Sequence, residues 1–250
     1  SRGLGDVYKR QLVYSMHYFS FIFNHYTSNE KISAFCNCTK GFIQSIKQKL
    51  LQIMIWKECK SLIVSDLERL TKINKWGGVK SLLFNASFRI TFWFRIGSYL
   101  ITKHHFMAKF CLRCVQLIHK HNQYLTGIQI GFGTKIGKAL MFPHYSCIVI
   151  NGSAIIGDNC TIYHGVTVGS VRGPKGGAPH IGNNVVIASG AKVIGNITIG
   201  NNVMIGSGAI VVTDIPDNSV VVGNPGKVIS KRGLELSLIH ISEPTRQEAI

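Results

Sequence analysis

Acidic side chains are scarce in this sequence, which has 28 lysines and arginines against 11 aspartates and glutamates in 250 residues. The imbalance is largest between Met54 and Leu125, with 12 basic residues and 3 acidic ones. Such a charge favours anionic partners, namely nucleic acid or a membrane surface. The aromatic and Arg/Lys motif of RNA-binding domains is missing, so we expect no nucleic-acid partner.

Long apolar runs are missing too, since none reaches the roughly 18 to 20 residues that span a bilayer. The segment Phe88–Leu100 is nevertheless aromatic and basic. Its predicted apolar face consists of Phe88, Phe92, Ile96 and Tyr99. Either this helix packs on the rest of the protein, which we favour, or residues 54–125 bind the inner face of an anionic membrane.

The seven cysteines lack the spacing of a zinc site or of a secreted disulfide scaffold. A reducing, cytoplasmic location fits best, and we expect no bound metal. Cys111 and Cys114 have the spacing of a redox motif, but they fall in a helical pattern and are interpreted as two small helix residues.

The two ends of the chain look foreign to the fold. Residues 1–11, SRGLGDVYKRQ, and the start of 236–250, LSLIHISEPTR, resemble translated sequencing-adaptor DNA. Residues 12–53 are rich in Phe, Ile, Asn and Lys without periodicity, and they are interpreted as upstream read-through. This leaves a basic helical segment at 54–126 and a second domain at 127–235.

A six-residue repeat dominates the second domain. Aliphatic residues recur at intervals of six within three blocks, at Ile130, Ile136, Ile150, Ile156, Ile162, Val168, Ile181, Ile187, Val193, Ile199, Ile205 and Val211. A small or branched residue lies four positions after most of them. Three such units complete one turn of a triangular coil whose aliphatic side chains point inward. A β-sandwich would instead alternate with period two, with turns about every 8 to 12 residues.

We therefore predict a mainly β fold, a left-handed parallel β-helix preceded by a short α-helical segment. The period is interrupted twice, with 14 positions from Ile136 to Ile150 and 13 from Val168 to Ile181. The second interruption holds SVRGPKGGAPH and predicts a loop that leaves the coil, a usual place for function. The final DIPDNSVVVGNPGKVI is expected to close the end of the prism.

The hexapeptides, the extruded loop and the closing VVVGNPGKVI together resemble the hexapeptide acyltransferases, and within them the serine acetyltransferase-like branch, from about Gly127 to Ser230. The basic helical segment resembles forms found with surface-polysaccharide genes. This resemblance implies a homotrimer that binds its co-substrate acetyl-CoA between neighbouring prisms. It also implies a catalytic base just before the regular rungs, where LMFPHYSCIVING places His144.

Acetyl transfer to a hydroxyl needs a base, and a neutral imidazole suits this task near pH 7. In serine acetyltransferases, an aspartate fifteen residues earlier orients the histidine and an acidic residue directly precedes it. Here these positions hold Gln129 and Pro143. We expect Gln129 to orient His144 by a hydrogen bond, without a charge that would stabilise an imidazolium.

The family's Arg-His pair at the end of the loop, which helps to hold an amino-acid carboxylate, is replaced near Gly177 and Ala178. An amino acid needs charged partners, whereas a sugar hydroxyl does not. The departures therefore favour a sugar or nucleotide-sugar acceptor in surface polysaccharide synthesis, with serine in cysteine biosynthesis as the alternative.

The predicted CoA groove lies along the residues that flank the loop. Its candidates are Gly169, Ser170, Ser189, Ala191 and Lys227, whose ammonium group suits a phosphate. Gly169 matches the family directly, and the other four are chosen on geometry.

Two further classes stay open. His144, His164 and His180 suggest a zinc site like that of the hexapeptide carbonic anhydrases, but their spacings of 20 and 16 depart from a coil period of about 18. The other class is a β-helix without activity that serves only as an interaction scaffold, against which bound CoA would argue.

Overall fold

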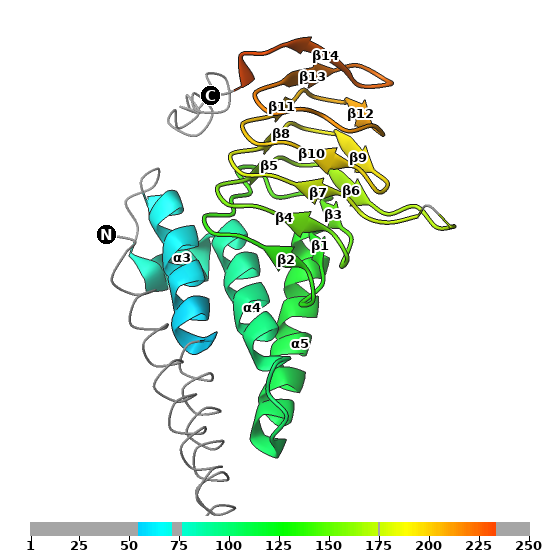
Figure 1. Ribbon diagram of the computed structural model, residues 1–250. Helices are drawn as coiled ribbons and strands as arrows, with labels where there is room; N and C mark the ends of the chain where they lie inside the picture. The colour runs from blue at the N-terminus through cyan, green and yellow to red at the C-terminus, as the bar shows by residue number, and fades with distance from the viewer. Residues whose placement is uncertain (1–54, 72–76, 175, 234–250) are drawn as a thin grey trace, which may run out of the picture. The chain divides into compact units, whose positions relative to one another are not determined.

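The computed structural model describes residues 55–71, 77–174 and 176–233 (Figure 1). The chain divides into two compact units, Ser1–Ile55 and Trp56–Ile250, and the strands that the structure describes belong to the second. The ends predicted to be foreign, 1–53 and 236–250, lie outside the described residues, so their origin stays a prediction.

Helices precede the strands. Residues 55–71 are helical, and they are followed by α3 (Gly78–Phe84), α4 (Ala86–Leu100) and α5 (Phe106–Thr126). Side chains cap the two longer helices, because Asn85 Oδ1 accepts the Phe88 N–H at 2.9 Å and His105 Nδ1 accepts the Ala108 N–H at 3.2 Å. The predicted α-helical segment is confirmed.

Helix α4 is packed within this segment. Phe88, Ile90 and Phe94 are all buried. The Tyr99 ring lies edge-on to that of Trp56, with centroids 5.1 Å apart. The structure supports packing of Phe88–Leu100 on the protein, since Phe88 is buried and Phe92, Ile96 and Tyr99 are half-buried. Membrane binding by residues 54–125 stays a prediction.

The strands are short and form three sheets (Figure 1). The first sheet has the order β1-β3-β6-β9-β12, the second β10-β7-β4-β2 and the third β14-β13-β11-β8-β5. Their bounds are β1 (Gln129–Ile130), β2 (Lys135–Ile136), β3 (Val149–Ile150), β4 (Ile155–Ile156), β5 (Thr161–Ile162), β6 (Thr167–Gly169), β7 (His180–Ile181), β8 (Val186–Ile187), β9 (Lys192–Ile194), β10 (Thr198–Ile199), β11 (Met204–Ile205), β12 (Ile210–Val211), β13 (Val220–Val222) and β14 (Lys227–Ser230). Successive strands of a sheet come from successive coils, which confirms the predicted left-handed parallel β-helix.

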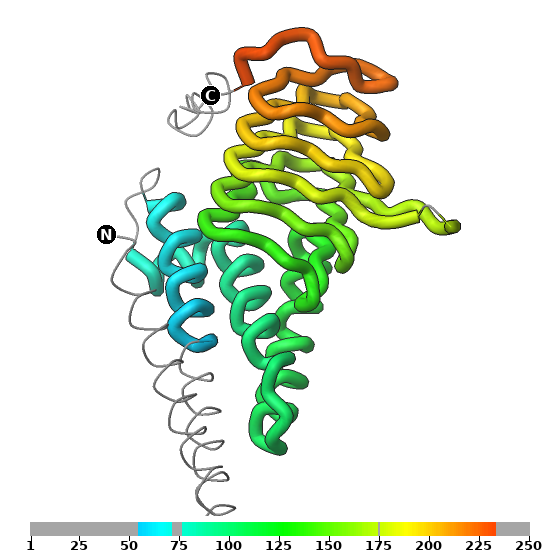
Figure 2. Tube along the Cα trace, viewed as in Figure 1, coloured from blue at the N-terminus to red at the C-terminus, as the bar shows by residue number. Residues whose placement is uncertain are grey.

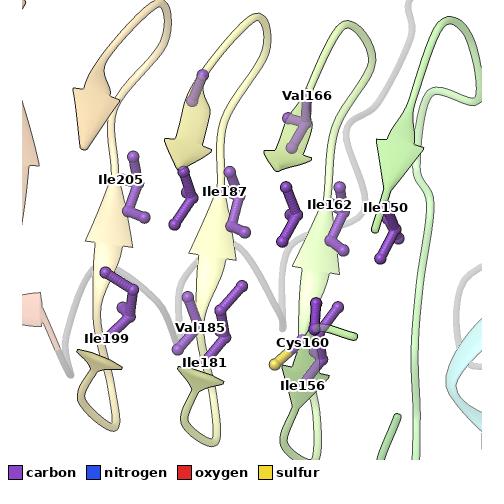
Figure 3. Packing of buried hydrophobic residues seen from close by; sticks show 14 of the residues in the cluster. Ile150, Ile156, Cys160, Ile162, Val166, Ile181, Val185, Ile187, Ile199 and Ile205 are labelled. Carbon is purple, nitrogen blue, oxygen red and sulfur yellow. The ribbon is translucent and has the colours of Figure 1, made fainter. Parts of the chain in front are cut away.

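The core of the prism consists of the repeat's aliphatic residues. All twelve anchors predicted from the six-residue period are buried. Figure 3 shows how they stack from coil to coil, for example Ile162, Ile187 and Ile205 on neighbouring strands of the third sheet. Burying each such side chain contributes roughly 1.5–3 kcal/mol, so the stack is the main source of stability.

An asparagine ladder runs along the corner between the second and third sheets. The amide Nδ2 of Asn159 donates to Asn184 Oδ1, Asn184 to Asn202 and Asn202 to Asn218, each at 2.9 Å. All four residues have left-handed backbone angles, with φ between 56° and 62°. Asparagine tolerates this conformation and bonds to its neighbour, which explains its recurrence in the repeat. Ala139 holds the same position in the first coil, with φ 56°.

The two breaks in the period leave the stacking intact. The loop between β6 and β7 projects from the coil (Figure 2), while β7 still pairs with β4 in parallel. At the far end, in the segment predicted to close the prism, β14 turns back and pairs with β13 in the antiparallel direction.

Side chains from the helices cap the carbonyl groups of the first coil. These bonds join His119 Nε2 and Gln123 Nε2 to Ile130 O at 3.0 and 2.9 Å, Ser98 Oγ to Phe132 O at 2.7 Å, Arg95 to Ile136 O and Gly137 O at 2.7 and 2.6 Å, and Arg69 to Ala139 O. No coil lies beneath these carbonyls within the described residues, so the helices supply the donors that a preceding coil would otherwise provide.

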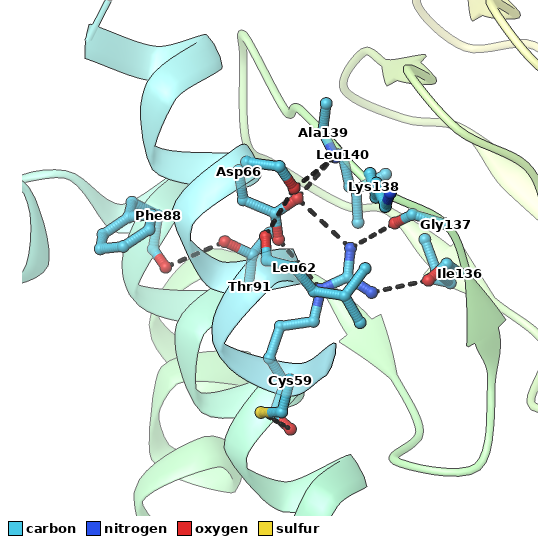
Figure 4. Close-up of polar contacts among 12 residues, drawn as sticks. Cys59, Leu62, Asp66, Phe88, Thr91, Ile136, Gly137, Lys138, Ala139 and Leu140 are labelled. Carbon is cyan, nitrogen blue, oxygen red and sulfur yellow. Dashed lines mark hydrogen bonds and ion pairs between the residues drawn. The ribbon is translucent and has the colours of Figure 1, made fainter. Parts of the chain in front are cut away.

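A buried ion pair lies at this junction (Figure 4). Arg95 Nε lies 3.0 Å from Asp66 Oδ2, and the two side chains are 3% and 1% exposed. Asp66 Oδ1 also accepts the Leu140 N–H at 2.9 Å. Burial raises the pKa of Asp66, and the charge of Arg95 opposes that shift.

Replacing Arg95 by leucine leaves the Asp66 carboxylate buried without its cation, so we expect the free energy of unfolding to fall by about 3–5 kcal/mol at neutral pH. As the pH falls through the raised pKa of Asp66, the native state takes up the proton before the unfolded state does, and part of the loss is recovered. Urea titrations across pH measure both effects. Arg89→Leu on the same helix is the matched control, and equal losses in the two variants would contradict the assignment.

Candidate active site

The turns that lead from the third sheet to the first stack into one edge of the prism, here called the histidine corner. It comprises residues 142–148, 163–166, 188–191 and 206–209. Backbone bonds link the turns, from Gly165 N to Ser146 O at 2.8 Å, from Gly190 N to His164 O at 2.9 Å and from Gly208 N to Ser189 O at 2.9 Å. Each turn has a left-handed residue, in order Cys147, Gly165, Gly190 and Gly208. The residues just before these four therefore occupy equivalent positions, coil after coil.

His144 lies in the longest of these turns. Met141 pairs with Thr161 and Val149 with Thr167, so the turn that holds His144 has two more residues than the next one. The additional residues lengthen the turn without shifting the register of the strands. His144 is half-buried there, in the place predicted for the catalytic base.

The next turn brings a second histidine to His144. The ring centroids of His144 and His164 are 6.0 Å apart and edge-on, and the Tyr163 ring lies 6.0 Å from His144. Ser189 Oγ lies 3.3 Å from His164 Nδ1. The corner thus places a half-buried imidazole, an exposed imidazole and a hydroxyl on three adjacent turns.

His164 was considered only as a zinc ligand in the sequence, and its nearness to His144 was missed. The spacing of 20 looked irregular against a period of about 18. The parallel bridge from Met141 to Thr161 shows that 20 residues make one full coil here, because the turn at His144 is longer. The spacing of 14 between Ile136 and Ile150 shows these two extra residues in the sequence. Adding them to a period of about 18 predicts that His144 and His164 lie one coil apart.

Gln129, the predicted partner of His144, is exposed in β1 and pairs with Val149 of β3. Its N–H donates to Ile148 O at 2.7 Å. Among the residues that the structure describes, no hydrogen bond joins the Gln129 side chain to His144. Orientation of the base by Gln129 stays a prediction.

The five residues predicted to bind CoA lie at three separate places. Ser189 and Ala191 belong to the histidine corner, and the Ala191 side chain is fully buried inside the prism. Gly169 and Ser170 lie at the carboxyl end of strand β6 of the first sheet, whereas Ser189 and Ala191 precede the neighbouring strand β9, and Asn151 Nδ2 donates to Ser170 Oγ at 2.9 Å. Lys227 is exposed in β14. Within a single chain, these residues do not gather around one cavity.

The projecting loop carries one described cation, Arg172. Val171 and Gly177 form an antiparallel bridge, which brings the start of the loop beside its end. Gly177 also lies against Asn196, and Ala178 is buried. The exposed Arg172 guanidinium therefore follows directly on the residue that pairs with Gly177, where the family has its Arg-His pair.

The three histidines considered for zinc do not converge. His180 lies on β7 of the second sheet, paired with Ile155 and Thr198, whereas His144 and His164 share the histidine corner. Within residues 55–71, 77–174 and 176–233, no group of three potential ligands is placed to hold a metal ion.

Buried groups near the corner are poor nucleophiles. Burial raises the pKa of the Cys160 thiol to about 11, and burial also raises that of Tyr163. Arg69 binds Cys160 O at 2.9 Å and Thr161 Oγ1 at 2.6 Å, and burial lowers its pKa to about 10. The imidazoles are therefore the groups here that suit proton transfer near neutral pH.

Sequence comparison links this site to one class of enzyme. Residues 178–213 match the family model "Bacterial transferase hexapeptide (six repeats)". The chain is similar to the serine acetyltransferase of Staphylococcus aureus (strain Mu50 / ATCC 700699), with 41% identity over 136 residues, 52% of this chain and 64% of that one. It is 44% identical over 119 residues to the enzyme of Staphylococcus epidermidis, strain ATCC 35984, covering 47% and 56%. The chain thus spans less than two thirds of these curated relatives.

Solved structures lead to the same class. The Neisseria gonorrhoeae serine acetyltransferase in complex with serine is 28% identical with a TM-score of 0.58, covering 68% of this chain and 69% of that one. The soybean apoenzyme is 28% identical with a TM-score of 0.59, covering 69% of each. Part of the chain matches the hexapeptide repeat of bacterial transferases, and the relatives and solved structures named here are serine acetyltransferases.

These comparisons correct the predicted acceptor. The departures at Gln129, Pro143, Gly177 and Ala178 favoured a sugar in polysaccharide synthesis, but the relatives at 41% and 44% identity are serine acetyltransferases. The sugar prediction is therefore wrong. It failed because four missing charged groups were taken as the absence of an amino-acid site, although other side chains can supply charge.

Two cysteines test the described geometry of the corner. We expect iodoacetamide at about pH 8 to alkylate the exposed Cys147 and to leave the buried Cys160 intact, because only a thiolate in contact with solvent reacts. Peptide mass spectrometry distinguishes the two sites. Both should react in urea, and rapid labelling of Cys160 in the native chain would contradict its placement.

Proposed function

We propose that this chain transfers the acetyl group of acetyl-CoA to the hydroxyl oxygen of L-serine. The observation that carries the proposal is the 41% identity with a serine acetyltransferase over 136 residues. The similar N. gonorrhoeae enzyme binds serine. The histidine corner adds a chemical reason, since it places His144 half-buried beside a second imidazole.

In this reaction His144 acts as general base. Its neutral imidazole takes the proton of the serine hydroxyl while the oxygen attacks the thioester carbonyl. The tetrahedral intermediate then breaks its C–S bond, and the imidazolium returns the proton to the leaving sulfur. The products are O-acetylserine and CoA with a free thiol, so atoms and charges balance.

The site has to stabilise the His144 imidazolium without the family's aspartate. Gln129 offers an amide oxygen at most, which lacks the charge of a carboxylate. We assign a positioning role to His164, whose Nδ1 is held near Ser189 Oγ at 3.3 Å. Its ring lies edge-on to His144, where it limits the orientations that the base can adopt.

We infer that the working form is a homotrimer with acetyl-CoA between neighbouring chains. The support is the separation of the predicted CoA residues, because Gly169 and Ser170 lie at the carboxyl end of strand β6 whereas Ser189 precedes the neighbouring strand β9. A groove between two prisms unites the histidine corner of one chain with the loop edge of the next. Lys227 is assigned to a CoA phosphate, as an exposed ammonium can bind one.

A serine carboxylate needs a cation, and we propose that Arg172 supplies it. The family's pair is absent at Gly177 and Ala178, but the bridge from Val171 to Gly177 brings Arg172 to the same part of the loop. A guanidinium binds a carboxylate with two parallel hydrogen bonds. Arg172 thereby replaces the missing charge from the opposite strand of the loop.

His144→Ala should lower kcat for thiol release from acetyl-CoA and L-serine by about 10²–10⁴-fold, because the variant lacks the general base. The assay follows the free CoA thiol. His180→Ala, on the second sheet, is the matched control and should keep its rate. Full activity of His144→Ala would overturn the mechanism, and no release with serine by the unmodified chain would overturn the proposed function.

Arg172→Ala should raise KM for L-serine by about 10- to 100-fold and leave KM for acetyl-CoA unchanged, because only the amino acid loses a charged bond. Arg172→Lys should recover part of the loss. Arg232→Ala, an exposed arginine near the other end, serves as control. An equal rise in both KM values would instead place Arg172 on the CoA side of the groove.

A further inference from the structure

Helix α5 has two apolar faces, and only one of them is used inside the chain. Its buried residues are Ala108, Val115, His119, Asn122 and Thr126. The opposite side, here called the outer α5 face, consists of Phe106, Met107, Phe110, Leu117, Ile118, Tyr124 and Leu125, all exposed. Phe106, Leu117 and Tyr124 are 81%, 74% and 77% exposed, which is unusual for such large apolar side chains.

The inner face is fully committed to the fold. His119 Nε2 lies 3.0 Å from Ile130 O, and its ring lies 4.7 Å from that of Phe132. A helix cannot turn its other side to the same core, because the two faces point in opposite directions. The outer α5 face therefore has no partner among the residues that the structure describes.

Basic side chains border the outer α5 face. Lys109, Arg113 and Lys120 follow at helical spacing along one flank, and Lys120 Nζ lies 5.1 Å from the centre of the Tyr124 ring. The sequence has no aspartate or glutamate between Glu68 and Asp158. An apolar face edged by cations, without any acidic residue, matches an anionic lipid surface.

We propose that the outer α5 face binds the surface of an anionic phospholipid membrane, a property separate from acyl transfer. The phenylalanines and leucines enter the boundary between headgroups and acyl chains, and the cations bind lipid phosphates. None of the described helices is long and apolar enough to cross a membrane. The helix therefore lies along the surface.

Charge decides between a membrane and a second copy of this chain. Pairing two outer α5 faces would bring Lys109, Arg113 and Lys120 of both copies together, and α3, α4 and α5 have no acidic residue to compensate them. Lipid phosphates supply that compensation. Within residues 54–125, for which membrane binding was predicted, this surface lies on α5 and not on α4, where Phe88 is buried.

The test is flotation of the full chain with vesicles. We expect binding to vesicles of phosphatidylglycerol and phosphatidylcholine, little binding to phosphatidylcholine alone, and a clear decrease when salt rises from about 0.1 M to about 0.5 M. The double variant Phe110→Glu/Leu117→Glu should lower the bound fraction about tenfold or more, since each change puts a charge in place of an exposed apolar group that membrane binding would bury. Val212→Glu/Ile229→Glu changes two exposed apolar residues of the β-helix and should leave binding unchanged.

Equal binding by the two double variants would overturn the proposal, as would equal binding to neutral and anionic vesicles. Absence of flotation together with self-association that Phe110→Glu/Leu117→Glu abolishes, seen by light scattering, would identify a second copy as the occupant and also overturn it. Thiol release by the same variants without vesicles keeps this result separate from the proposed acyl transfer.

Discussion

Register between successive coils is the constraint on which the rest of this structure depends. Each rung donates backbone hydrogen bonds to the next, and each buried Ile or Val must lie on the one beneath it. Residues in excess of six per side can therefore leave the prism only at its corners. The two breaks in the period do so, one as the longer turn at His144 and one as the loop that carries Arg172. The candidate site residues His144 and Arg172 thus lie where the register permits irregular backbone, a usual place for function.

The helices continue this order at the first coil. Arg95 and Arg69 donate to carbonyls that have no coil beneath them, and Asp66 neutralises Arg95 within a buried site. A buried ion pair contributes little net stability compared with apolar packing, but it defines a single geometry. In this chain it fixes how the helical segment 55–71 lies on the prism. The prism in turn determines which side of α5 is covered.

The repeat could be predicted from sequence because it is local. A six-residue unit with an aliphatic anchor specifies its own strand and corner, so each of the twelve anchors is buried as expected. Predicting that His144 lies beside His164 requires a coil of 20 residues, two more than the usual 18, because the turn at His144 is longer. The sequence could not tell whether α4 or α5 keeps an exposed apolar face. Both helices are amphipathic, and only tertiary packing decides which face is covered. The acceptor was misjudged because the absence of charge at Gln129, Pro143, Gly177 and Ala178 says nothing of cations elsewhere, such as the exposed Arg172 on the other strand of the loop.

The capping of the first coil has a consequence for assembly. A β-helix ends in open strand edges, and unpaired edges of this kind join to one another into fibres. Here the side chains of Ser98, His119 and Gln123 form hydrogen bonds with the carbonyl groups at one end of the prism. At the other end, the antiparallel strand β14 pairs with β13. With both ends of the β-helix covered in this way, prisms cannot join end to end into fibres. This leaves lateral contact between prisms as the route by which a closed, countable oligomer can form.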